Sequence, residues 1–332
     1  MSKRKIKIQF VDFWDGFDIN NNEFIDVLNE IYHVEFSDNP EYLFYSGFGN
    51  QHLKYKCIRI FYTGECITPN FNECDYAISF DRMTFGDRYL RIPLYNLFQY
   101  KIEYLSLFNR SAFTKEDLEK KDRFCSFVVS NCFADDVRAV FFDKLSAYKT
   151  ISSGGRFRNN IGGAVADKKA FQAKHKFAIA FENTSYDGYC TEKLMEAFAA
   201  GTIPIYWGDP NVAKDFNPEA FINAHDYATF DEVIERVKEI DQNDNLYLKI
   251  RNANPLLVES TDNGLSNFLY HIIDQDYKKA FRRPDSIPSK SEASFKLRHE
   301  FYETKIYRPY KKVCNLIKRI KTGTFITSRR TK

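Results

Sequence analysis

The stretch Phe177-Ala-Ile-Ala-Phe-Glu-Asn-Thr-Ser-Tyr-Asp-Gly-Tyr-Cys-Thr-Glu-Lys193 combines an apolar run with a polar loop and the start of a helix. Its first five residues predict a buried strand, and the loop that follows contains Gly188. Thr191 is a good N-cap for a helix over 191–200, and Gly201 stands where that helix ends. A strand, a loop and a helix in this order point backbone N–H groups and a positive dipole end at the loop, which favours pyrophosphate binding.

Lys193 is the unusual residue of this stretch. A cation in the first turn of a helix opposes the helix dipole, whereas the neighbouring Glu192 suits it. An anion bound at this helix end would compensate the lysine. The alternative is a Glu192–Lys193 pair that points into water. Leu194, Met195 and Phe198 follow at helical spacing and predict the buried face of the helix.

Strands and helices alternate through the rest of the chain, which predicts an α/β protein with mainly parallel sheets. Apolar runs predict strands at 6–10, 42–45, 57–62, 75–80, 124–130 and 203–206. Helical patterns occupy 22–31, 134–146, 229–240 and 264–274. A polar stretch at 114–123 predicts a linker, so we expect two lobes with a cleft between them.

Composition and charge narrow the class of protein. The 332 residues are 44% hydrophobic and 28% charged, which allows about two folded domains and excludes a disordered chain. The net charge of +3 is unevenly distributed, because residues 301–332 carry ten basic side chains and one acid. An acidic body argues against a nucleic-acid-binding domain, and the basic end requires an anionic partner.

The basic end has helical periodicity. Val313, Leu316, Ile317 and Ile320 recur at helical spacing among lysines and arginines, which predicts a basic amphipathic helix on anionic lipid. The alternative is a solvated or disordered tail, and nucleic-acid binding is the least favoured of the three interpretations. The prediction is therefore a linker and membrane-association tail over 286–332.

The patterns of cysteine, histidine and glycine residues argue against several classes of protein and of binding site. Seven cysteines, none spaced C-x-x-C, favour a reducing compartment over a disulfide framework or zinc site. The six histidines lack metal-ligand spacing, and Asp274-Gln275-Asp276 stands at a predicted helix end, where we expect it to be solvated. Neither G-x-G-x-x-G nor a P-loop is present, and no stretch reaches 18 apolar residues. We expect a cytoplasmic protein without a metal site.

Two further segments contain candidate site residues. Tyr62-Thr63-Gly64-Glu65 follows the strand at 57–62, so Glu65 falls where open α/β sheets place ligands. It could be a general base, and the alternative is a solvated loop glutamate. The run from Gly154 to Asn160 is basic, and its arginines could clamp phosphate or belong to a solvated turn.

Motifs in a fixed order support these candidates. They are Phe61-Tyr-Thr-Gly-Glu65, Asp75-Tyr-Ala-Ile-Ser-Phe-Asp81, Asp87-Arg-Tyr-Leu-Arg-Ile-Pro-Leu-Tyr95, Phe124-Cys-Ser-Phe-Val-Val-Ser-Asn131, Gly154-Gly-Arg-Phe-Arg-Asn159, Phe181-Glu-Asn-Thr184, Thr191-Glu-Lys193 and Thr202-Ile-Pro-Ile-Tyr-Trp-Gly-Asp-Pro210. Together they cover roughly residues 57–240, and they resemble α1,3/4-fucosyltransferases, in particular the bacterial branch known from Helicobacter.

This resemblance implies a GT-B fold, with two Rossmann-like lobes that face a cleft. The expected lobes are 1–118, which binds the acceptor, and 119–285, which binds GDP-fucose. The resemblance also implies an inverting transfer with Glu65 as the general base. Carried over position by position, the donor-binding residues are Arg158, Glu182, Asn183, Tyr189, Glu192 and Lys193. Arg158 and Lys193 match the pair that faces the pyrophosphate, and Glu192 matches the acid that binds the ribose.

The expected function is transfer of L-fucose from GDP-fucose to the GlcNAc of N-acetyllactosamine-type glycans such as Galβ1-4GlcNAc, which would build Lewis antigens on surface polysaccharide. No cofactor is required, because lysine and arginine would balance the diphosphate. The heptad repeats of the Helicobacter enzymes and the membrane anchor of the animal enzymes are not visible, so we expect a short cytosolic form on the inner face of the membrane. The alternatives are a GT-B transferase for another nucleotide sugar and a non-catalytic membrane-associated glycan-binding protein.

Overall fold

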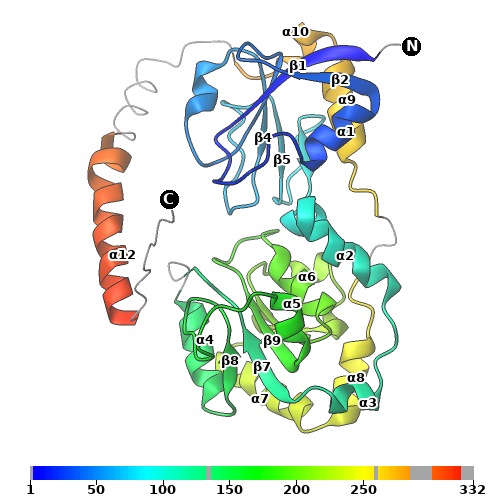
Figure 1. Cartoon of the computed structure of the whole chain (residues 1–332), viewed down its shortest axis with the longest axis vertical. Coiled ribbons are helices and arrows are strands. Elements are labelled where there is room, and N and C mark those ends of the chain that lie inside the picture. Colours follow the sequence, from blue (N-terminus) through cyan, green and yellow to red (C-terminus); the bar gives the residue numbers. More distant parts are fainter. Residues whose placement is uncertain (1–2, 132–135, 258–260, 285–300, 323–332) are drawn as a thin grey trace.

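The computed structural model describes residues 3–131, 136–257, 261–284 and 301–322. Two parallel β-sheets form two lobes, one above the other in Figure 1. The first sheet has the order β2-β1-β3-β4-β5-β6, with β1 Arg4–Val11, β2 Tyr32–Phe36, β3 Tyr42–Tyr45, β4 Ile58–Tyr62, β5 Tyr76–Ser79 and β6 Tyr89–Arg91. The second has the order β11-β10-β9-β7-β8, with β7 Arg123–Phe127, β8 Ile151–Ser153, β9 His175–Phe181, β10 Ile203–Trp207 and β11 Ile222–Asn223. The expected two-lobed α/β fold is confirmed.

The helices cover these sheets because their apolar faces need burial. In chain order they are α1 Glu23–Ile31, α2 Lys101–Ser106, α3 Lys115–Glu119, α4 Val137–Ser146, α5 Lys168–Ala173, α6 Glu192–Ala199, α7 Phe230–Asp241, α8 Asp244–Asn252, α9 Leu265–Asp274, α10 Tyr277–Ala280 and α12 Arg308–Thr322. Strands β3 and β4 are buried at every position, which explains why β3 is a continuous apolar run and why β4 is apolar apart from the buried Arg59.

The predicted lobe boundaries differ from the structure at two places. Helix α9 was expected in the second lobe of 119–285, but Leu265, Leu269 and Ile272 lie in the core of the first lobe. Helices α9 and α10 therefore return the chain to the first lobe, where Figure 1 shows α9 beside α1. In the other direction, Tyr104 and Leu107 of the expected 1–118 lobe pack with α6 in the second. Periodicity identifies an apolar face, but not the sheet that it covers.

Three smaller expectations can be compared with the structure. The predicted linker at 114–123 contains α3, which begins with a capping box between Thr114 and Asp117. Asp274 at the end of α9 is an exposed partner of Arg4, as expected for a solvated helix end. The six cysteines of the described ranges are free thiols, and Cys132 lies outside those ranges.

The C-terminal region contains helix α12, and Val313, Leu316 and Ile317 on it are exposed. Its association with a membrane remains a prediction. Among the helices that the structure describes, none is both long and apolar enough to span a bilayer.

Candidate active site

Glu65 lies just beyond the carboxyl end of β4, at the edge of the first sheet that faces the second lobe. The Thr63 hydroxyl accepts from the Glu65 N–H at 3.0 Å and donates to the Glu65 carbonyl at 3.1 Å. These two bonds form a tight turn. Leu94 lies 3.0 Å from the position that a Cβ on Gly64 would take, so a side chain at residue 64 would crowd the turn. The turn therefore holds the Glu65 backbone in a defined position.

Charges from the second lobe act on Glu65. Its side chain reaches solvent, but surrounding protein atoms partly desolvate it and raise the pKa of its carboxyl group. Lys193 opposes this shift, whereas Glu192 adds to it. The pKa of Glu65 is therefore sensitive to the charged residues in the first turn of α6. A carboxylate with a raised pKa is a better proton acceptor than an ordinary one.

An aromatic pocket of about 580 Å³ opens beside Glu65 in the first lobe. Its lining includes Trp14, Phe48, Tyr62, Phe98 and Tyr100. The Tyr62 hydroxyl is buried and has no hydrogen-bond partner among the described residues. Flat aromatic faces and a free hydroxyl suit a ligand with both apolar and polar surfaces, such as a sugar ring.

In the second lobe, the loop between β9 and α6 is organised by Glu182. This carboxylate is fully buried and accepts from the Thr191 N–H at 2.7 Å, from the Thr191 hydroxyl at 2.6 Å and from Lys193 Nζ at 3.0 Å. Thr191 occupies the predicted N-cap position, but its hydroxyl donates to Glu182 instead of capping the helix. These hydrogen bonds from Thr191 and Lys193 to Glu182 therefore fix the geometry at the start of α6.

Lys193 is not a solvated lysine. Its side chain is 16% exposed, and its ammonium group lies 3.0 Å from Glu182 and 3.3 Å from Glu192. Burial disfavours its charge, but the two carboxylates outweigh burial and raise the pKa of Lys193. For Glu192, burial is likewise outweighed by Lys193 and Lys168, so the pKa of Glu192 is lowered. The predicted alternative of a pair pointing into water is wrong.

Tyr189 and Asn183 lie in the same loop. Tyr189 is buried, and its ring packs against Phe80 of the first lobe with centroids 5.1 Å apart. Burial raises the pKa of Tyr189, and the charges of Glu182, Lys193 and Glu65 also act on it. The Asn183 side chain accepts a hydrogen bond from the buried Arg138 at 3.2 Å. Through its contact with Phe80, Tyr189 links the loop that leads to Lys193 with the lobe that contains Glu65.

Arg158 has a different environment. It adopts a left-handed backbone conformation with φ of 56°, and its guanidinium donates to Asp143 at 2.8 Å. The contacts described for Arg158 are with Asp143 and the Phe157 ring rather than with Lys193. The structure therefore brings together Glu65, Tyr189, Glu192 and Lys193, whereas Arg158 is held in an exposed ion pair.

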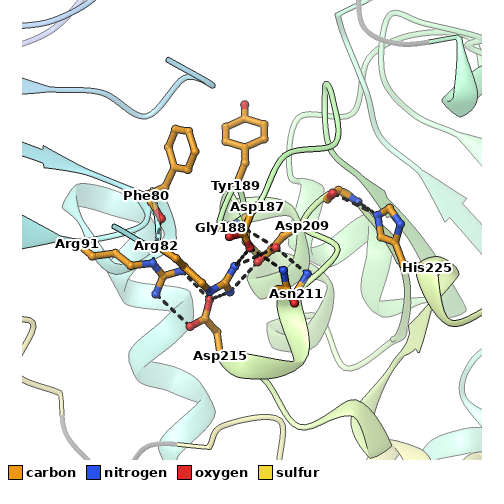
Figure 2. A network of polar contacts seen from close by, with 12 residues as sticks. Phe80, Arg82, Arg91, Asp187, Gly188, Tyr189, Asp209, Asn211, Asp215 and His225 are labelled. Atoms are coloured by element: carbon orange, nitrogen blue, oxygen red, sulfur yellow. Dashed lines mark hydrogen bonds and ion pairs between the residues drawn. The ribbon is translucent and has the colours of Figure 1, made fainter. Parts of the chain in front are cut away.

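The sequence analysis missed a network of charges that joins the lobes. Figure 2 shows Arg82 and Arg91 of the first lobe beside Asp187, Asp209 and Asp215 of the second. Arg82, Arg91 and Asp209 lie within or next to the motifs quoted above, and Asp187 lies in the stretch 177–193, but spacing along the chain assigned none of the five a role. The only available signal was the position of Arg82 directly after β5, next to the strand that leads to Glu65.

Two family models match the chain over most of its length. The first, "Alpha-(1,3)-fucosyltransferase FucT N-terminal domain", covers residues 8–98. The second, "Glycosyltransferase family 10 (fucosyltransferase) C-term", covers residues 118–252. A crystal structure of an α1,3-fucosyltransferase with GDP is 33% identical, with a TM-score of 0.70 over 83% of this chain and 92% of that one. The chain belongs to the α1,3-fucosyltransferase family.

Other relatives agree with this family. The α1,3-fucosyltransferase FucT of Helicobacter pylori is 36% identical over 82% of this chain and 64% of its own length. The human 4-galactosyl-N-acetylglucosaminide 3-α-L-fucosyltransferase 9 is 31% identical over 41% of this chain and 38% of its own length. A crystal structure of an α1,3-fucosyltransferase with GDP-fucose has a TM-score of 0.68 and 32% identity over 86% of this chain and 93% of that one. The chain thus spans less than two thirds of these two sequence relatives.

Membership of the family confirms the resemblance and the GT-B architecture expected from the motifs. The roles of individual residues remain predictions.

Proposed function

We propose that this protein transfers L-fucose from GDP-fucose to the 3-hydroxyl of GlcNAc in Galβ1-4GlcNAc-type glycans. One observation carries the proposal: in a member of this family, Glu65 follows β4 beside an aromatic pocket, and Tyr189 of the loop that leads to Lys193 packs on Phe80, which follows the neighbouring strand β5. The solved relatives with GDP and with GDP-fucose support the donor. The name of the human relative supports a 4-galactosylated GlcNAc as the acceptor.

The chemistry needs opposite charges on opposite sides of the fucose ring. Glu65 takes the proton from the acceptor hydroxyl as its oxygen bonds to the anomeric carbon, and the bond from that carbon to the diphosphate breaks with its electron pair on GDP. Attack from the face opposite the leaving group inverts the configuration. The raised pKa of Glu65 makes it a stronger base for this step.

Lys193 and the N-terminus of α6 balance the charge that develops on the departing diphosphate. The ammonium group is held by Glu182, so it is already in place before the donor binds. Fixed charges of this kind stabilise a transition state without reorganising. Arg158 would add a second cation by exchanging Asp143 for phosphate, and an exposed ion pair is weak enough to be exchanged. We therefore propose that the donor needs no metal ion.

The aromatic pocket beside Glu65 is the proposed acceptor site. Galactose and GlcNAc present apolar C–H faces that pack on aromatic rings, and Trp14 and Phe48 supply such rings. The described lining of the pocket comes from the first lobe and includes Glu65, so an acceptor bound there would lie next to the proposed base.

The proposed setting is surface-glycan synthesis at the inner membrane face, where the product would be a Lewis-type structure. Ten basic residues in 301–332 and the exposed apolar side chains of α12 support a peripheral contact with anionic lipid.

The direct test is a product analysis. The purified protein is incubated with Galβ1-4GlcNAc or Galβ1-3GlcNAc and a panel of GDP-fucose, GDP-mannose and UDP-glucose, and any product is analysed by NMR. We expect an α1,3-fucosylated product from GDP-fucose and Galβ1-4GlcNAc. A product from another nucleotide sugar alone would contradict the donor, and an α1,4 product alone would contradict the linkage.

A further inference from the structure

We propose that Arg82 is a positioning residue for fucosyl transfer: it seats the donor loop, residues 182–190, on the first lobe and so sets the distance between Glu65 and the bound donor. This inference rests on the proposed function. It assigns a role to a residue whose described partners are carboxylates of the other lobe, and these contacts across the cleft carry it.

The guanidinium of Arg82 reaches three carboxylates of the second lobe. Its nitrogens lie 2.8 Å from Asp187, 2.7 Å from Asp209 and 2.6 Å from Asp215. Arg91 on β6 adds a second ion pair to Asp215 at 2.7 Å. Figure 2 shows that both arginines come from the first lobe and all three carboxylates from the second. These side chains are largely shielded from solvent except Asp187, so salt screens their mutual attraction less than that of surface ion pairs.

The carboxylates connect Arg82 to the backbone of the donor loop. Asp209 is fully buried, and its Oδ1 accepts from the Gly188 N–H at 2.9 Å. Asp187, the residue before Gly188, is bonded to Arg82 and to Asn211. Arg82 therefore acts on the 187–188 turn both directly and through Asp209.

The same turn makes close contact with the first lobe. Gly188 has a φ of +82°, and a Cβ there would lie 2.6 Å from the Phe80 carbonyl oxygen. Tyr189 packs on the Phe80 ring, and the Tyr186 hydroxyl lies 3.4 Å from Thr68. Only a glycine allows the loop to approach this closely. The contact and the ion pairs thus hold one turn from both sides.

The position of the donor loop sets how the donor lies relative to Glu65. Phe80 and Arg82 follow β5, and Glu65 follows β4, which is paired with β5 in the same sheet. The donor loop begins at Glu182 and leads into Lys193. A shift of the loop away from Arg82 would move the donor away from Glu65. Displacement by about 1 Å can lower a reaction rate about 10²-fold.

The test compares Arg82→Gln and Arg82→Lys with the wild-type protein in transfer to Galβ1-4GlcNAc, hydrolysis of GDP-fucose by water, and GDP binding. For Arg82→Gln we expect kcat for transfer to fall about 30- to 100-fold. The dissociation constant of GDP should change less than about threefold, and the ratio of hydrolysis to transfer should rise, because water needs no alignment with Glu65. Arg82→Lys should recover part of kcat.

Arg88→Gln is the matched control, because Arg88 donates to the first-lobe carbonyls of Asp75, Phe71 and Cys74. It should lower stability without changing the ratio of hydrolysis to transfer. An unchanged kcat and ratio in a folded Arg82→Gln protein would overturn the proposal.

Gly188→Ala disturbs the same loop at its contact with Phe80 instead of at its ion pairs. This variant tests the proposal if Arg82→Gln does not fold. The added methyl should push the loop off Phe80 and raise the ratio of hydrolysis to transfer. Gly86→Ala is its control, since Gly86 also has a positive φ but open space around it. A wild-type ratio in Gly188→Ala would count against the proposal.

A readout without activity separates this inference from the proposed function. In hydrogen exchange, the peptide over 183–190 should exchange faster in Arg82→Gln than in the wild type, whatever the protein transfers. If the wild type transfers no fucose but this loop is released, the proposed function fails and the role of Arg82 in seating the loop stands. If exchange is unchanged, the inference fails.

Discussion

At the scale of single residues, Glu65 and Glu182 have opposite environments. Glu65 reaches solvent at the cleft, whereas Glu182 is fully buried and accepts three hydrogen bonds from Thr191 and Lys193. Donor binding by Glu182 stays a prediction, and its described contacts hold Thr191 and Lys193 in place. Motifs identify which residues belong together, but burial decides which of them can reach a ligand.

Glu182→Gln should therefore reduce stability. A glutamine of the same shape would present an N–H group to donors that now bind a carboxylate, and a buried hydrogen-bond mismatch costs about 1–3 kcal/mol. The free energy of unfolding in urea measures this loss. Glu65→Gln is the matched control and should unfold as the wild type does. Equal stability of Glu182→Gln and wild type would contradict the buried role.

The pH dependence of transfer follows from the raised pKa of Glu65. A general base must be ionised, and burial shifts its ionisation above the ordinary glutamate value of about 4.3. We expect kcat/KM to fall with decreasing pH through a midpoint above that value. The residual activity of Glu65→Gln should lack this midpoint. A midpoint at or below the ordinary value would show that Glu65 is not the desolvated base.

At the scale of elements, the strand, loop and helix at 177–201 could be predicted because their signals are local. Gly201 has a φ of +74° after α6, as its predicted place at the helix end requires. The lobe to which α9 belongs could not be predicted, since its apolar face would fit either sheet. The ion-pair network around Arg82 could not be predicted from the sequence either, because the partners of Arg82 are more than 100 residues away along the chain.

Gly155 offers a test of element packing. It follows β8, and a Cβ there would lie 2.0 Å from the Val129 carbonyl oxygen. Gly155→Ala should destabilise the protein by about 1–3 kcal/mol or more, because backbone must move to make room. Gly163→Ala is the control from the same loop, since a Cβ there meets open space. Thermal unfolding compares the two, and equal melting temperatures would contradict the close approach.

At the scale of the whole molecule, the uneven charge distinguishes a mildly acidic body from a strongly basic C-terminal end. The body carries the cleft, and residues 301–332 carry ten of the 48 basic side chains. The two-lobed fold could be predicted because many motifs keep the same order along the chain. The membrane role of α12 rests on periodicity, charge and exposure, so it needs its own test.

Deleting residues 301–332 should abolish binding to anionic phosphatidylglycerol vesicles and leave transfer to a soluble acceptor unchanged. Binding of the full chain should weaken as salt increases, because each basic residue near the surface contributes about 1 kcal/mol of screened attraction. Neutral phosphatidylcholine vesicles are the control. Cosedimentation measures both, and undiminished binding of the shortened chain would contradict the role of the tail.

The central claim is that Glu65 is the base in a fucosyl transfer whose donor binds at Lys193. Its most direct test measures two quantities for the wild type and Glu65→Gln: transfer of fucose from GDP-fucose to Galβ1-4GlcNAc, and the dissociation constant of GDP. We expect Glu65→Gln to lose transfer by at least about 10²-fold, the usual contribution of a general base, while its affinity for GDP remains that of the wild type. Transfer at the wild-type rate by Glu65→Gln would contradict the claim.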